Sequence, residues 1–225
     1  MLKLFRALDR NPQWLAAWTL IALVGTLASG HVLSGVAAPL AEKTGFKLVD
    51  LQFSGWYPIL DAIRPGQRSV NDLLASVGFE THRASDIIQA WQKAGLLETA
   101  RRAQRIDFVF AAAYGVFALL LAVTLWRIQP EYPRRVRSVR LIALGTIAAA
   151  LDEIENVGLW TVLRGSGDAG EVSFLLPTAV ATLKVVFLIA ALVGLVVSLV
   201  RAHNAFESSA EIPTDAADRR PGPSA

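Results

Sequence analysis

Four polar residues stand together inside an apolar stretch of this chain: Asp152, Glu153, Glu155 and Asn156. Carboxyl groups can donate or accept a proton, bind a cation or pair with a Lys side chain. Each ionised side chain in the middle of a bilayer costs roughly 2.5–3.5 kcal/mol on insertion scales, which makes it a candidate functional group. The cluster must therefore be paired, protonated, hydrated or turned away from lipid.

The spacing of these residues places them on one side of a helix. Asp152, Glu155 and Asn156 stand at positions i, i+3 and i+4, which share a helix face. Glu153 falls at the edge of that face. The sequence thus predicts a polar face directed towards the interior of a helical membrane protein.

Three other apolar stretches also hold polar residues. Asp107 and Tyr114 share a stripe of one stretch, Lys184 is the only charge inside another, and His31 lies in the first. Counted along helices, these groups fall at compatible depths in the outer half of the bilayer. We predict that a ligand-binding cluster forms from Asp107, Tyr114, Asp152, Glu155, Asn156 and Lys184.

The four apolar stretches are each long enough to cross a bilayer, which takes about 20 helical residues. They cover approximately 13–36, 106–127, 138–163 and 174–200, and 53% of all residues are hydrophobic. We expect an all-α fold, an integral membrane four-helix bundle within residues 1–203, with 40–105 as an extracytoplasmic helical cap. The composition of 204–225 predicts a disordered cytoplasmic tail.

Local signals refine these boundaries. Pro39 is expected to end the first span, and the weak alternation of 45–53 allows an extended segment. A capping pattern predicts a short helix over 69–77, and the apolar spacing predicts a longer helix over 85–104 with a bend near Ile106. That longer helix either lies on the outer membrane surface or packs over the bundle.

Basic residues gather at the N-terminus, in the 127–140 loop and after the last span. The positive-inside rule then places both termini and the 127–140 loop in the cytoplasm. We expect the chain to lie in the inner (plasma) membrane. The 37–105 segment is also basic, but long segments cross the membrane largely regardless of charge. A cleaved signal peptide at the N-terminus is the alternative, although no good cleavage site follows the basic residues.

Several kinds of chemistry are disfavoured by the composition. The chain has no Cys and three His residues, so thiol nucleophiles and Cys metal sites are excluded. No phosphate-binding loop, zinc-protease pattern or hydrolase elbow occurs. We expect no metal site and no cofactor. The Arg-rich 134–140 segment is better explained as a topology anchor than as a site for nucleic acid.

The order of these motifs resembles a family of bacterial integral membrane proteins with four spans and no characterised activity. The resemblance covers about 45–190, and its most specific part is the Asp-x-x-Glu-Asn motif of 152–156. The other matching parts are 49–53, 107–110 with Tyr114, and Lys184. The resemblance implies the four-span architecture and no activity. A looser similarity to sterol-isomerase-like membrane bundles rests on acidic groups in a membrane cavity.

These observations favour a membrane protein that binds a small amphipathic or lipid-like ligand. Lys184 would either meet an anionic group of the ligand or neutralise Asp152 and Glu155. One alternative is an intramembrane enzyme that uses Asp152 or Glu155 as acid or base. Another is a structural protein whose polar cluster only fixes helix packing. The expected partners are the lipid bilayer and such a ligand, and the sequence leaves a homo-oligomer open.

Overall fold

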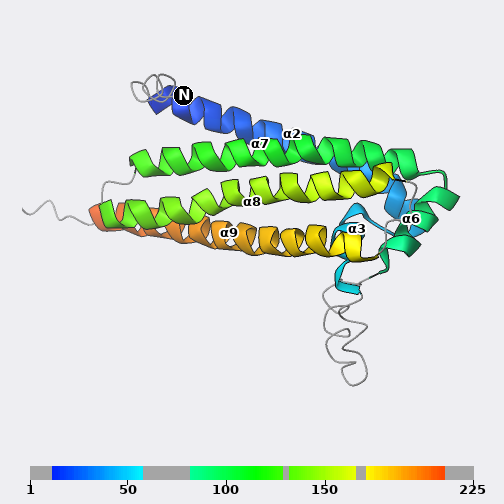
Figure 1. The fold of residues 1–225 in the computed structure, drawn as a ribbon. Helices are drawn as coiled ribbons and strands as arrows, with labels where there is room; N and C mark the ends of the chain where they lie inside the picture. Colours follow the sequence, from blue (N-terminus) through cyan, green and yellow to red (C-terminus); the bar gives the residue numbers. More distant parts are fainter. Residues whose placement is uncertain (1–11, 58–81, 129–131, 166–170, 211–225) are drawn as a thin grey trace, which may run out of the picture.

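The computed structural model describes residues 12–57, 82–128, 132–165 and 171–210, and all regular structure within them is helical. The all-α class is therefore confirmed. Four helices are long, and two short helices and a 3-10 turn lie between them (Figure 1). In chain order they are α2 (Pro12–Thr44), α3 (Leu48–Phe53), α6 (Ala84–Lys93), α7 (Leu97–Ile128), α8 (Tyr132–Arg164), η1 (Glu171–Phe174) and α9 (Leu175–Ala210).

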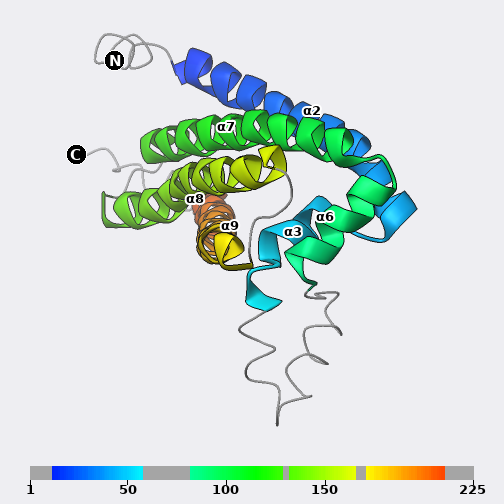
Figure 2. The ribbon, with the colours of Figure 1, turned by 45° about the vertical axis from the view of Figure 1, so that its right-hand side comes forward.

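The long helices lie side by side in the order α2, α7, α8, α9. Each packs against the next, whereas α2 and α9, at the two ends of the row, barely touch within the described residues. Figure 2 shows the row curving into an arc, with α3 and α6 beside one end of it. The described helices thus leave an open side between α2 and α9, and a closed four-helix bundle stays a prediction.

Small residues let neighbouring helices approach closely, as is common in membrane proteins. A Cβ atom added to Gly115 of α7 would lie 2.7 Å from the Cβ of Ala149 in α8. A Cβ atom added to Gly158 of α8 would lie 2.8 Å from the Cγ of Pro177 in α9. Glycine is required at both contacts because no side chain fits between the helices.

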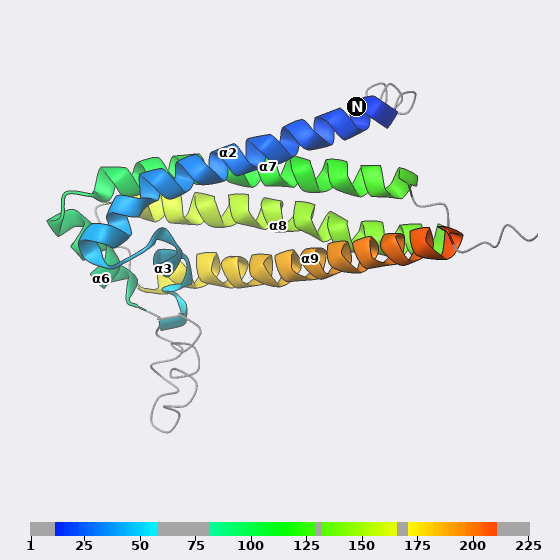
Figure 3. The same ribbon diagram turned by 180° about the vertical axis from the view of Figure 1, so that it is seen from behind.

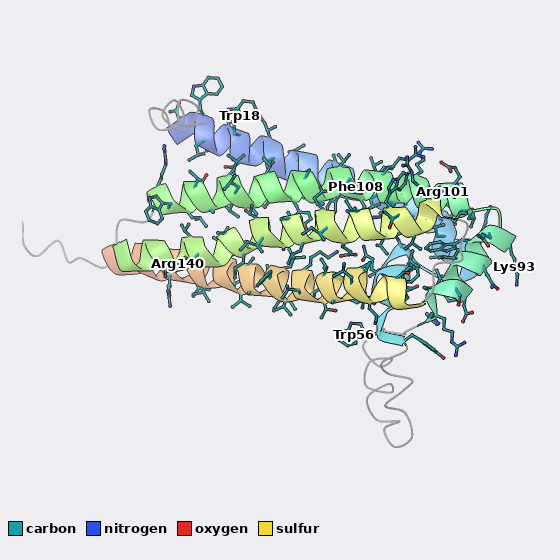
Figure 4. The ribbon with its side chains drawn as sticks, in the orientation of Figure 1. Trp18, Trp56, Lys93, Arg101, Phe108 and Arg140 are labelled. Atoms are coloured by element: carbon teal, nitrogen blue, oxygen red, sulfur yellow. The ribbon has the colours of Figure 1, made fainter. Side chains whose placement is uncertain are left out.

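Three of the four long helices are long and apolar enough to cross a membrane: Gln13–Thr44, Leu97–Arg127 and Leu175–Val197. Many of their large apolar side chains point away from the protein, including Trp18, seen at the edge of α2 in Figure 4. The helix α8 is as long as α2 but does not meet the same criterion. Charged residues interrupt α8, with Arg residues in its first turns and three carboxyl groups in its middle, so its uncharged stretch is shorter.

The beginning of α2 and the end of α9 lie at the same end of the molecule, and α3 and α6 lie at the opposite end (Figures 1 and 3). There α3 and α6 form a compact apolar cluster with the adjoining ends of α2, α7 and α8. Leu51 of α3 and Ile87 and Trp91 of α6 are completely buried in it. We call this part the end cluster.

The end cluster is tied to α9 by the residues that follow α3. The backbone N–H of Gly55 donates to Thr178 Oγ1 at 3.0 Å, and Trp56 Nε1 donates to Thr182 Oγ1 at 3.0 Å. Trp56 is labelled in Figure 4. Thr178 Oγ1 in turn donates to the carbonyl oxygen of Gln52 at 2.8 Å. The bond to its carbonyl oxygen fixes Gln52 beside the long helices, where it lines a cavity described below.

Two expectations at the start of the chain are wrong. Pro39 does not end the first span, because α2 continues to Thr44 and buries Leu40 completely in the end cluster. That burial outweighs the hydrogen bond that Pro39 cannot make. The 45–53 segment is not extended, because Leu48–Phe53 forms α3 and its first turn is capped by Asp50.

The expected helix over 85–104 is also wrong. The helix α6 ends at Lys93, where Gly95 turns the chain with a φ of +69°, a conformation that favours glycine. The helix α7 then begins at Leu97 and passes Ile106 without a break. At the other end of the chain, α9 extends to Ala210, into the predicted tail, and the short helix expected over 69–77 lies outside the described residues.

Candidate functional site

Lys184 is the centre of the polar cluster. Its Nζ lies 2.7 Å from Asp152 Oδ1 and 2.6 Å from Glu155 Oε2, so one α9 side chain pairs with two α8 carboxyl groups. The contact to Asp152 is also a hydrogen bond, and the contact to Glu155 is an ion pair. Asp152 and Glu155 can reach the same cation because they stand one helical turn apart.

The cluster extends to α7 through Tyr114. The hydroxyl group of Tyr114 donates to Asp152 Oδ2 at 2.9 Å, so both oxygens of Asp152 accept hydrogen bonds, one from each neighbouring helix. Asp152 and Glu155 are almost completely buried, with 4% and 0% of their surface exposed. Charged groups buried in this way are expected to be paired.

Asn156 has a different partner, which the sequence analysis did not identify. Gln104 Nε2 of α7 donates to Asn156 Oδ1 at 2.6 Å, and both side chains are completely buried. Gln104 continues the stripe of Asp107, Ala111 and Tyr114 by one turn. That spacing was a usable signal, but the bend expected near Ile106 separated Gln104 from the stripe.

Asp107 is buried but unpaired. It is 5% exposed and makes no hydrogen bond or ion pair with another residue in the described part of the chain. Its carboxyl group lies on the wall of a cavity that also exposes Asp152 and Lys184. Asp107 therefore belongs to the same site as the ion-paired cluster without being part of its network.

This cavity has a volume of about 580 Å³ and lies on the concave side of the arc, with walls from α2, α3, α7, α8 and α9. Its charged side chains gather near the end cluster, and the rest of its lining is apolar except for Thr26 of α2, whose hydroxyl group donates to the carbonyl oxygen of Ala22. The polar part includes Gln52, Asp107, Tyr114, Asp152 and Lys184. The apolar part includes Phe117, Ala118, Leu121, Ile142, Gly145, Leu188, Ala191, Leu192 and Leu195.

The shape of the cavity follows from the helices that enclose it. At about 1.5 Å per residue, the wall of α7 from Asp107 to Leu121 is roughly 20 Å long. The cavity also opens to the side, because Leu192 lines it and is nevertheless 60% exposed. An elongated molecule with one polar end would match this distribution of side chains.

The structure brings the six predicted site residues into one region with two kinds of environment. Asp107, Tyr114, Asp152 and Lys184 face the cavity. Glu155 lies behind Lys184, and Asn156 pairs with Gln104, so neither is on the cavity wall. Glu153 is half-buried, and His31 is exposed on α2 and away from the cavity.

Within the described ranges, no three His, Asp or Glu side chains are placed to hold a metal ion together. The functional groups that face the cavity are the ammonium group of Lys184, the carboxyl groups of Asp107 and Asp152, and the hydroxyl group of Tyr114. Comparisons of the chain with models of protein families, with curated proteins and with solved structures give no match.

Proposed function

We propose that this chain is an integral membrane protein that binds a small amphipathic or lipid-like molecule in the cavity between its long helices. The observation that carries the proposal is the division of one cavity into a charged end and a long apolar part. Ligand sites are typically apolar cavities of 300–1,000 Å³ with a few convergent polar groups, and the cavity here has about 580 Å³.

The topology we propose has four membrane helices, with α8 as the fourth span. The polar face of α8 is turned inward, while Ile154 and Val157 on its other side are more than half exposed and suited to lipid. The end cluster with α3 and α6 would be the extracytoplasmic cap. Both termini would be cytoplasmic, in the inner membrane, as the basic residues of the sequence favour.

A cavity-filling substitution tests the binding proposal. Ala191→Phe places a phenyl ring in the apolar part of the cavity. Ala191 is two helical turns from Lys184 on α9, so the ion pairs of Lys184 should be kept. The matched control is Ala112→Phe, because Ala112 is an exposed residue of α7 that does not line the cavity. Wild type and both variants would be purified in lipid nanodiscs, and co-purifying molecules identified by mass spectrometry.

We expect an amphipathic species that is enriched with the wild type and with Ala112→Phe, and lost from folded Ala191→Phe. Circular dichroism and thermal unfolding would establish that the variant is folded. Identical profiles of bound molecules for the three folded proteins would contradict a ligand in this cavity.

A structural role for the polar cluster is a second candidate, and one observation favours it. The two ion pairs of Lys184 join α8 to α9, and the hydrogen bond of Tyr114 joins α7 to α8. This role would account for the pairs but not for the cavity or for unpaired Asp107. An enzyme that uses Asp152 or Glu155 has less support, because Glu155 is off the cavity wall and both oxygens of Asp152 are occupied.

A further inference from the structure

The charged end of the cavity contains more acidic than basic groups. Asp107 and Asp152 are buried on its wall, Glu155 is buried behind the wall, and Lys184 is the only cation among the described residues that line the cavity. Lys184 is already paired with Asp152 and Glu155, at 2.7 and 2.6 Å. Among the described residues that line the cavity, no second positive side chain is available to pair with Asp107.

The position of Asp107 makes this imbalance relevant to a ligand. Asp107 is 5% exposed, lines the cavity and has no partner in the described structure. A buried carboxylate without a partner is costly, and a positively charged group in the cavity would remove that cost. An anionic ligand would instead face Asp107 and Asp152 and would find Lys184 occupied.

The helix that carries Asp107 also presents aromatic side chains to the cavity. Phe110, Tyr114 and Phe117 line the cavity from the same helix as Asp107. The rings of Phe110 and Tyr114 are in contact, with 5.4 Å between their centroids. Aromatic faces attract ammonium groups, and a carboxylate with aromatic neighbours is a common way to bind an organic cation.

We propose that the polar end of the ligand is an organic cation, an ammonium or protonated amine group, that lies against Asp107 and carries an apolar tail. This inference rests on the proposed ligand-binding function and specifies the chemical class of the ligand. The tail would follow the apolar part of the cavity towards Leu121 and Leu195.

Three radiolabelled probes with the same tail and different polar ends separate the possibilities: dodecyltrimethylammonium, dodecanol and dodecyl sulfate. Saturable binding would be measured below the concentrations that disturb bilayers, with the full chain in nanodiscs of a neutral galactolipid, which carries no ammonium group, and empty nanodiscs as the reference. We expect the wild type to bind the cation most tightly and the sulfate most weakly.

The variant Asp107→Asn keeps the shape of the side chain and removes its charge. We expect it to weaken binding of the cation by about tenfold or more and to leave dodecanol binding unchanged. The matched control is Glu153→Gln, which removes a carboxyl group near the site but off the cavity wall and should retain binding of the cation.

The head-group comparison in the wild type does not depend on the folding of any variant. Equal or tighter binding of dodecanol or dodecyl sulfate, abolished by Ala191→Phe, would overturn the cationic ligand and leave the amphipathic one standing. No saturable binding of any probe to the folded wild type would overturn both. Tight binding of the cation that is unaffected by Asp107→Asn would overturn the role given to Asp107.

Discussion

Lys184 reaches from α9 to the Asp152 carboxyl group of α8, with 2.7 Å between Nζ and Oδ1. The side chain of Lys184 is 10% exposed and that of Asp152 is 6% exposed, so both charges have left water. Neither group would be stable at this position without the other. The pair therefore makes the packing of α8 against α9 depend on two individual side chains.

Replacing Lys184 by Met leaves Asp152 and Glu155 buried without a cation. Breaking a buried pair in this way destabilises a protein by about 3–5 kcal/mol, and we expect a loss of that order. Thermal unfolding in lipid nanodiscs and the folded yield measure it. The triple variant Lys184→Met/Asp152→Asn/Glu155→Gln should recover part of the loss, because neither carboxylate that Lys184 neutralised is then present. A single variant as stable as the wild type would contradict the pairing.

Replacing Tyr114 by Phe removes the hydroxyl group that donates to Asp152 Oδ2 and keeps the aromatic ring. We expect a loss of stability of about 1–2 kcal/mol, because Lys184 still pairs with Asp152. The comparison is Thr124→Val, which removes a hydroxyl contact of 3.0 Å with Thr19 between α7 and α2. Both variants should lower the unfolding temperature, but only Tyr114→Phe should alter binding of the amphipathic probes.

Replacing Gly55 by Ala should separate the end cluster from α9. The added Cβ would collide with the carbonyl oxygen of Phe174 and would lie 2.5 Å from Thr178 Oγ1, which accepts the Gly55 N–H. Hydrogen exchange of the α3 amide groups should become faster. Gly25→Ala is the matched control, since nothing lies within 4 Å of its added Cβ. A mid-helix alanine should stabilise α2 by up to about 1 kcal/mol.

The proposed orientation can be tested with single cysteines, because the chain has no Cys of its own. Gln89, an exposed residue of α6, should react as Gln89→Cys with a membrane-impermeant maleimide on intact cells. Ser224→Cys in the C-terminal segment should react only after the membrane is permeabilised. The reverse pattern would place the end cluster in the cytoplasm.

The sequence predicted the polar face of α8 because helical spacing alone brings Asp152 and Glu155 together. It also identified Lys184 as a partner, since a lone cation among apolar residues has few other ways to be neutralised. It did not show which acidic side chain would have no partner in the structure. That outcome depends on the rotation of α7 relative to α8, which turns Tyr114 towards Asp152 and leaves Asp107 facing the cavity.

The arrangement of the elements was harder to predict than the site. Gly95 has a positive φ and separates α6 from α7. The apolar residues on both sides of it nevertheless follow a spacing that also fits one uninterrupted helix. Likewise, four long helices can close into a bundle or stay in a row. The choice depends on close contacts such as those at Gly115 and Gly158, whose partners the sequence does not reveal.

The open side of the arc, between α2 and α9, would give a membrane-dissolved ligand a route into the cavity. If the ligand enters from the bilayer between α2 and α9, its relevant concentration is its mole fraction in the leaflet and not its concentration in water. Each added methylene group then favours transfer from water into lipid by about 0.8 kcal/mol but adds little to the step from lipid into an equally apolar cavity. Tail length would set how much ligand the membrane holds, and the polar end would set which ligand the protein selects.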